Sequence, residues 1–225
     1  MDVNIHKGHR ERLKSRFINE GLDAFSSHQK LELLLFYGIP YKDTNELAHT
    51  LLNKYGSLSG VMNADYHELA RIKGIGPHAA LLVKLAPALA RSYSMDRWRD
   101  KPQITGVADA GKYAASLFVG LEKEAFYMIC LNAQNRVIEP VLINEGTINE
   151  AMVYPREIIE SAIRYKTSTV ILSHNHPSGS TEPSSADVDM TKKLRAALAV
   201  INVKVMDHLI VSGEKYLSLA ERQLI

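Results

Sequence analysis

The sequence predicts an α+β or α/β protein in two parts: an all-helical domain over residues 1–100 and a mixed α/β domain over residues 101–225. Between residues 11 and 93, apolar residues recur at three- and four-residue spacing, which is the period of a helix. From residue 125 onwards, short apolar runs typical of strands alternate with helical patterns. Residues 94–105 between these regions are polar and include Pro102, so we place the linker there.

The composition is that of an ordinary globular protein and excludes several classes. The 225 residues are 46% hydrophobic and 23% charged, and the formal net charge of +2 does not by itself require a nucleic-acid partner. Cys130 is the only cysteine, so an internal disulfide and a cysteine-based zinc site are both excluded. The N-terminal segment is too polar for a signal peptide, and no run reaches about 18 apolar residues. We therefore expect a soluble cytoplasmic protein without a membrane partner.

Glycine and aspartate mark the expected helix ends in the N-terminal region. Gly38, Gly56 and Gly74 each follow an apolar stretch, where a helix C-cap is expected. Asp43 and Asp65 precede helical patterns and are expected N-caps.

The C-terminal region is expected to contain four strands and two helices. The first two strands are joined by a turn around residues 133–135, and Pro155 suits the first turn of the first helix. In chain order the expected elements are strands 125–132 and 135–143, helix 155–166, strand 167–176, helix 184–201 and strand 203–211.

One segment has the spacing of a metal site. His174 and His176 are two residues apart at the end of an apolar strand, so both imidazoles lie on one face. The next helix begins near Ser184, which brings Asp187 into its first turn. Two histidines and one carboxylate leave a fourth position for water, as in catalytic zinc sites. A zinc ion there lowers the pKa of water and polarises a carbonyl. The sequence thus predicts one Zn²⁺ per chain, held by His174, His176 and Asp187.

Other interpretations of these residues remain open. Ser184 and Asp187 also have the spacing of a capping box, which needs no metal, and histidines at a strand end can be ordinary polar residues. His208, beside another apolar strand, is expected to be a structural residue or to support the site rather than to ligate the metal. Asp189 could replace Asp187 only with a different spacing.

The pattern His174-x-His176-Pro177, followed by Ser184 and Asp187, is similar to the signature of the JAMM (MPN-plus) zinc metalloproteases. Longer strings, from GHRERLKSRFINEGLDAF to SHNHPSGSTEPSSADVDMTKKL and MDHLIVSGEKYLSLAER, resemble the RadC family over nearly the full chain. The resemblance implies a JAMM/MPN-like fold for the second domain and hydrolysis of a peptide or isopeptide bond in an unknown protein or peptide substrate. It also implies Glu124 as general base, with Glu122 as the alternative, and Ser184 as a hydrogen-bond donor to the oxyanion.

The segment Lys73-Gly74-Ile75-Gly76 resembles the turn of a helix-hairpin-helix motif. In such a turn, backbone amides and the following helix N-terminus can face a DNA phosphate without reading the base sequence. Lys73 could add an electrostatic contact, and Ile75 would pack between the helices. The low charge of this region, together with Pro77 and His78, leaves a protein-binding or structural hairpin equally open.

Three hypotheses follow. The first is a RadC-like zinc-dependent hydrolase, acting in a DNA-associated context. The second is a DNA-binding or repair accessory protein with a structural or vestigial zinc site, and the third is a metal-bound scaffold. The presence of Glu124 beside His174, His176 and Asp187 favours the first.

Overall fold

The computed structural model describes residues 5–40, 42–98, 100–121, 123–146 and 153–225. The internal contacts of the chain define two compact units, Met1–Leu89 and Ala90–Ile225. The division falls inside helix α6 (Gly76–Asp96), so the first three residues of the expected linker are helical. The predicted domain boundary near residue 100 stays a prediction.

The first unit is all-helical, as the apolar spacing predicts. Its core packs leucines of α2 and α3 against α5 and the first turns of α6, with Leu31, Leu35, Leu51, Leu69 and Val83 fully or almost fully buried. Besides α6, its helices are α1 (Ile5–Glu20), α2 (Ser27–Gly38), α3 (Asn45–Tyr55), α4 (Leu58–Asn63) and α5 (Tyr66–Arg71).

Two of the three expected glycine C-caps are wrong. Gly56 is the left-handed C-cap of α3, with φ of 80°, as expected. Gly38 instead lies within α2, where an added Cβ would come 3.0 Å from the Cα of Ala79, so the glycine permits close packing of α2 on α6. Gly74 has φ of 101° but lies in the turn beyond α5, whose C-cap is Ile72.

The two expected aspartate caps differ in their outcome. Asp65 is the N-cap of α5, and its carboxylate accepts hydrogen bonds from the amides of His67 and Glu68. The N-cap of α3 is Thr44 rather than Asp43. Asp43 is therefore one residue before the N-cap. Its carboxylate nevertheless accepts a hydrogen bond from the Asn45 amide, the first of α3, at 2.9 Å.

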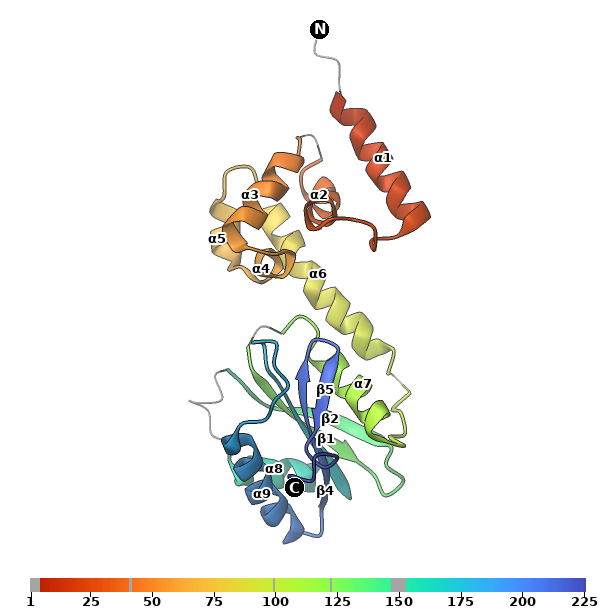
Figure 1. The fold of residues 1–225 in the computed structure, drawn as a ribbon, viewed down its shortest axis with the longest axis vertical. Coiled ribbons are helices and arrows are strands. Elements are labelled where there is room, and N and C mark those ends of the chain that lie inside the picture. Colours follow the sequence, from red (N-terminus) through yellow and green to blue (C-terminus); the bar gives the residue numbers. More distant parts are fainter. Residues whose placement is uncertain (1–4, 41, 99, 122, 147–152) are drawn as a thin grey trace. The chain divides into compact units, whose positions relative to one another are not determined.

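The second unit is a five-stranded mixed sheet with helices on both faces, which is an α+β architecture (Figure 1). The strand order is β2-β1-β3-β4-β5, and only β3 and β4 are parallel because α9 connects them. The strands are β1 (Ala125–Leu131), β2 (Val137–Glu145), β3 (Thr169–Asn175), β4 (Lys204–Ser212) and β5 (Lys215–Ser218). The helices are α7 (Val107–Leu117), α8 (Pro155–Arg164) and α9 (Ser185–Ala199). Helix α7 and strand β5 are absent from the sequence-based prediction.

The period-two alternation of β1 separates two apolar layers. Tyr127 and Ile129 pack on the side of α7, whereas Met128 and Cys130 pack on the side of α8 and α9. Cys130 is buried, and burial raises the pKa of its thiol to about 12, which agrees with the inert thiol expected from its apolar neighbours.

A β-bulge in β4 decides which residues face α9. Val170 pairs with Val205, but the next residue of β3, Ile171, pairs with Asp207, so Met206 is the inserted residue. Without this insertion the alternation would turn Asp207 towards the α9 side and His208 away from it. The bulge therefore places His208 on the same face as His174.

The packing of α7 on β5 gives a testable stability prediction. A methyl group at Gly111 would come 2.4 Å from the ring of Tyr216, so Gly111→Ala should destabilise the protein by about 1–3 kcal/mol. Lys112→Ala, at the adjacent exposed position, should stay within about 0.5 kcal/mol of wild type. Urea unfolding of the three proteins measures the difference; equal stability of Gly111→Ala and wild type would contradict this packing.

Across the residues that the structure describes, no helix combines the length and the apolar character needed to cross a membrane.

Candidate metal centre

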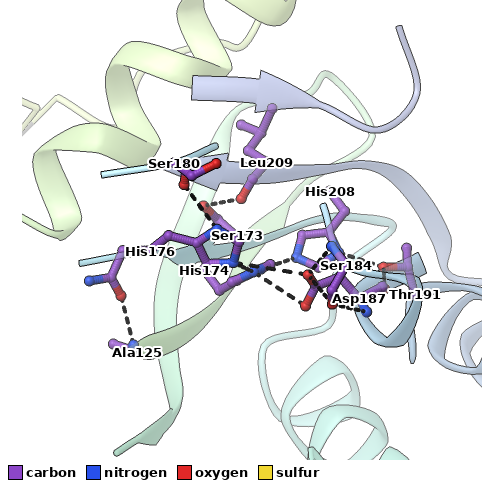
Figure 2. A network of polar contacts seen from close by, with 11 residues as sticks. Ala125, Ser173, His174, His176, Ser180, Ser184, Asp187, Thr191, His208 and Leu209 are labelled. Carbon is purple, nitrogen blue, oxygen red and sulfur yellow. Dashed lines mark hydrogen bonds and ion pairs between the residues drawn. The ribbon is translucent and has the colours of Figure 1, made fainter. Parts of the chain in front are cut away.

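Three side chains predicted to bind metal come together where β3 ends and α9 begins (Figure 2). The Nε2 atoms of His174 and His176 are 2.9 Å apart. The Oδ1 atom of Asp187 lies 3.4 Å from Nε2 of His174, and its Oδ2 atom lies 3.9 Å from Nε2 of His176. His174 is fully buried, Asp187 is buried and His176 is partly exposed. One side of this group is thus enclosed by protein and the other is open at His176.

The carboxylate of Asp187 is oriented by the first turn of α9. Ser184 is the N-cap, and its Oγ atom accepts the Asp187 amide at 3.1 Å. The Oδ2 atom of Asp187 accepts hydrogen bonds from the Ser184 amide at 2.8 Å and from the Ser184 hydroxyl at 2.6 Å. The capping box that the sequence left open as an alternative is therefore present, and it fixes the carboxylate with Oδ1 still 3.4 Å from Nε2 of His174.

His176 is held by the loop that follows β3. Its amide donates to the carbonyl of Val211, and its Nδ1 atom lies 3.0 Å from the carbonyl oxygen of Ser180. A carbonyl oxygen can only accept, so Nδ1 bears the proton and Nε2 keeps its lone pair. That lone pair faces His174 and Asp187, as a metal ligand requires.

The environment of His174 keeps its imidazole neutral. Burial lowers its pKa to about 4, the Asp187 carboxylate opposes this shift, and His176 adds to it. On the far side of the ring, Nδ1 lies 2.8 Å from Nε2 of His208. His208 is thus behind His174 and away from the three converging ligand atoms.

The spacing of the three side chains fits a divalent ion with nitrogen and oxygen ligands. Atoms about 2.0–2.1 Å from a tetrahedral zinc ion lie about 3.3 Å from one another. The observed separations of 2.9, 3.4 and 3.9 Å bracket that value. Two imidazoles and one carboxylate are a donor set that zinc accepts, and three ligands leave a further position open. The group formed by His174, His176 and Asp187 could therefore hold a metal ion.

The backbone around Glu124 is tied to the same strand. The side chain of Asn175, between the two histidines, accepts the Ala125 amide at 2.7 Å and donates to the Lys123 carbonyl at 3.1 Å. The carbonyl of Glu124 accepts the Gly146 amide at 2.8 Å. Glu124, itself partly buried, thus lies directly before β1 with its backbone held on both sides. Glu122, the alternative base, is outside the described residues.

The predicted DNA-contact residues form a turn between α5 and α6 in the first unit. Gly74 and Gly76 have φ of 101° and 68°, and Ile75 between them is 95% buried among the helices, since only 5% of its surface is exposed. Lys73 is exposed beside the turn. Ile75 therefore packs between the helices as expected, and the helix-hairpin-helix assignment stays a prediction.

The buried histidines give the metal-free protein a pH-dependent stability. Burial lowers the pKa of both His174 and His208, whereas an unfolded histidine titrates near its ordinary value of 6.5. The unfolded chain therefore binds more protons between pH 6.5 and 4, so stability is complete above this range and falls as the pH decreases through it. His174 alone contributes a loss on the order of 2 kcal/mol by about pH 5, and on the order of 3 kcal/mol once the pH is well below its pKa of about 4. Urea unfolding with a chelator at about pH 7.5 and about pH 5 measures it; equal stabilities would contradict neutral burial.

Comparison with known proteins agrees with this geometry. A family model described as RadC-like JAB domain matches residues 104–224, and one described as UPF0758 N-terminal matches residues 6–81. A UPF0758 protein of Fusobacterium nucleatum subsp. nucleatum is 35% identical over 232 residues, covering 100% of both chains. A UPF0758 protein of Pseudoalteromonas translucida is 36% identical over 215 residues, covering 96% of both. The chain, with a His-His-Asp group inside its RadC-like JAB domain, therefore belongs to the UPF0758 (RadC) family.

Proposed function

We propose that this protein is a zinc-dependent hydrolase of peptide or isopeptide bonds. The observation that supports it most is the convergence of His174, His176 and Asp187 into one group whose spacing fits a three-ligand metal ion. A purely structural metal site would need no open position, whereas three protein ligands with one partly exposed side leave room for a substrate.

Glu124 is the proposed proton carrier. Phe126 pairs with His174 across β1 and β3, and its ring stacks on that imidazole. Side chains alternate along an extended chain, so the residue two positions earlier, Glu124, is expected on the same side of the sheet as His174 and His176. The hydrogen bonds of the Asn175 side chain to the backbone of Lys123 and Ala125, on either side of Glu124, support this placement. The charge and the position suit a general base for the metal centre.

The proposed reaction follows from these positions. When bound, zinc supplies Lewis-acid activation of water and of the substrate carbonyl. Glu124 accepts a proton from the attacking water while the water oxygen bonds to the carbonyl carbon. Glu124 then delivers that proton to the amide nitrogen as the carbon–nitrogen bond breaks, so an acid and an amine leave. His174, His176 and Asp187 keep the ion in place throughout.

Ser184 is proposed to act first through Asp187. Its hydroxyl donates to Oδ2 of Asp187 and thereby fixes the carboxylate that faces the histidines. A hydrogen bond from Ser184 to an oxyanion requires this hydroxyl to turn away from Asp187 while the substrate is bound. The two roles therefore belong to successive states of the site.

The proposed function can be tested without knowing the substrate. Proteomes of cells producing wild-type, Glu124→Gln or His174→Ala protein should differ in at least one protein that accumulates uncut in both variants. Purified zinc-loaded wild type should cleave that protein, and the metal-free form should not. If no cleavage depends on Glu124 in cells and the zinc-loaded protein cleaves nothing, the scaffold hypothesis replaces this one.

A second proposal concerns the hairpin of the first unit, where Arg71 and Lys73 are exposed beside the glycine-flanked Ile75. We infer weak, sequence-independent contact with duplex DNA through this turn. Full-length protein should bind DNA with marked salt dependence, and Lys73→Glu should weaken binding and reduce the salt slope by about 1. Lys193→Glu, exposed in α9, is the control with a matched charge change. Absence of DNA binding at low salt, or an unchanged salt slope in Lys73→Glu, would exclude DNA contact through the hairpin.

A further inference from the structure

A chain of buried hydrogen bonds runs from His174 to the backbone of Asp187 (Figure 2). Nδ1 of His174 lies 2.8 Å from Nε2 of His208. Nδ1 of His208 lies 2.5 Å from Oγ1 of Thr191, and this hydroxyl donates to the carbonyl of Asp187 at 2.6 Å. His174, His208 and Thr191 have no exposed surface. The chain thus links β3, β4 and α9 and returns to a residue of the proposed metal site.

Three features of the fold build this chain. The bulge in β4 turns His208 towards α9, as described above. Thr191 is one helical turn after Asp187, so its hydroxyl reaches the Asp187 carbonyl within α9. The ring of Phe126 contacts both imidazoles, with centroids 6.3 Å from His174 and 5.5 Å from His208. Because they are fully buried beside this apolar ring, the side chains of His174, His208 and Thr191 hydrogen-bond to one another.

The proton positions in this chain follow from its two ends. The Asp187 carbonyl can only accept, so the single proton of Thr191 is directed to it and Oγ1 must accept from Nδ1 of His208. Nε2 of His208 then bears no proton and accepts from Nδ1 of His174. Nε2 of His174 is consequently left with its lone pair, facing His176 and Asp187. Each donor of this chain meets an acceptor, and the Nε2 lone pairs of His174 and His176, 2.9 Å apart, are left to share a metal ion.

The reverse arrangement is inferior on two counts. If Nε2 of His208 donated to His174, Nδ1 of His208 would have to accept from Thr191. The one hydroxyl proton would then be drawn away from the Asp187 carbonyl, which lies 2.6 Å from Oγ1. His174 would also carry its proton on Nε2, where no lone pair would remain for a metal ion.

We propose that His208 and Thr191 are positioning residues that hold His174 in the Nδ1–H tautomer and so keep its Nε2 available as a metal ligand. This inference rests on the proposed metal site. The partner of His174 is a second imidazole rather than the carboxylate that often supports a zinc-binding histidine. The chain also joins the orientation of His174 to helix α9, which carries the third ligand. Loss of a supporting partner of this kind typically weakens metal affinity by about 10–100-fold.

Two pairs of variants separate positioning from packing. Thr191→Val removes the hydroxyl with little change of shape, and Thr191→Ser retains it. His208→Phe removes both ring nitrogens, and His208→Gln retains an acceptor near His174. Zinc affinity of the full chain, measured by competition with a chromophoric chelator, should fall about 10–100-fold in Thr191→Val and His208→Phe. Thr191→Ser and His208→Gln should recover most of that loss. Urea unfolding of each variant shows that the fold is retained.

The tautomers can be read directly. Long-range ¹H–¹⁵N NMR spectra of the histidine rings should show the proton on Nδ1 in both His174 and His208 of the zinc-loaded protein. A proton on Nε2 of His208, or wild-type zinc affinity in both Thr191→Val and His208→Phe, would overturn the positioning role. If either of these results is obtained while the wild-type protein binds zinc, the positioning role fails but the proposed hydrolase function is unaffected. Wild-type protein that binds no zinc would overturn both proposals.

Discussion

Glu124→Gln should leave zinc bound and the fold intact while turnover falls by roughly a hundredfold to ten-thousandfold. The amide of glutamine cannot accept the proton of the attacking water, and it cannot return a proton to the leaving nitrogen. Glu124 is not among the three converging side chains, so metal content should equal that of wild type. The measurement is the rate of cleavage of the protein that accumulates uncut in cells, together with the zinc content of the same sample.

Glu122→Gln is the matched control, since it makes the same change two residues earlier. It should retain wild-type turnover. A dead Glu122→Gln beside an active Glu124→Gln would mean that Glu122 is the base. If neither variant changes cleavage but His174→Ala does, the metal has a structural role and proton transfer by these residues is excluded.

The second large effect concerns the ligands themselves. His174→Ala and His176→Ala each remove one of three ligands, so zinc affinity should fall by more than the roughly 100-fold upper range expected for loss of a supporting residue. Turnover should be lost with the metal. His78→Ala, an exposed histidine in the first unit, controls for non-specific zinc binding. Equal zinc content in His176→Ala and wild type after removal of loosely bound metal would contradict the site.

Short-range patterns predicted much of this protein. The spacing of His174, His176 and Asp187 is set by one strand end and one helix start, so their meeting could be derived from local geometry. The RadC resemblance is confirmed by the family comparisons. The roles of Glu124, Ser184 and the hairpin residues stay predictions, because geometry places these residues but does not show what they do.

The features that the sequence missed or left unspecified, such as the contact of His208 with His174, depend on long-range contacts. His208 is more than 30 residues beyond His174, and only the bulge at Met206 turns it towards that side chain. The alternation of residues along the strand does not indicate such an insertion. The two polar residues Asp207 and His208 within an apolar strand are the one sequence signal that points to His208. The sequence wrongly predicts Gly38 as a C-cap, because the contact that requires a glycine there is made with Ala79 on another helix.

The two missed elements had weak signals of different kinds. Helix α7 buries small residues, including Ala110 and Ala114, whose spacing stands out less than that of leucines. Strand β5 has only four residues, after a turn containing Gly213 with φ of 60°. The Gly-Glu turn before KYLS could have indicated this hairpin.

X-ray absorption at the zinc edge tests the central claim most directly, because it reports the ligands of the ion. The account predicts about one zinc per chain with nitrogen and oxygen neighbours at about 2.0–2.1 Å and the scattering of two imidazoles. His176→Ala, reloaded with zinc, should lose one imidazole contribution. A wild-type protein that retains no zinc, or a spectrum without imidazole that is unchanged in His176→Ala, would contradict a metal centre formed by His174, His176 and Asp187.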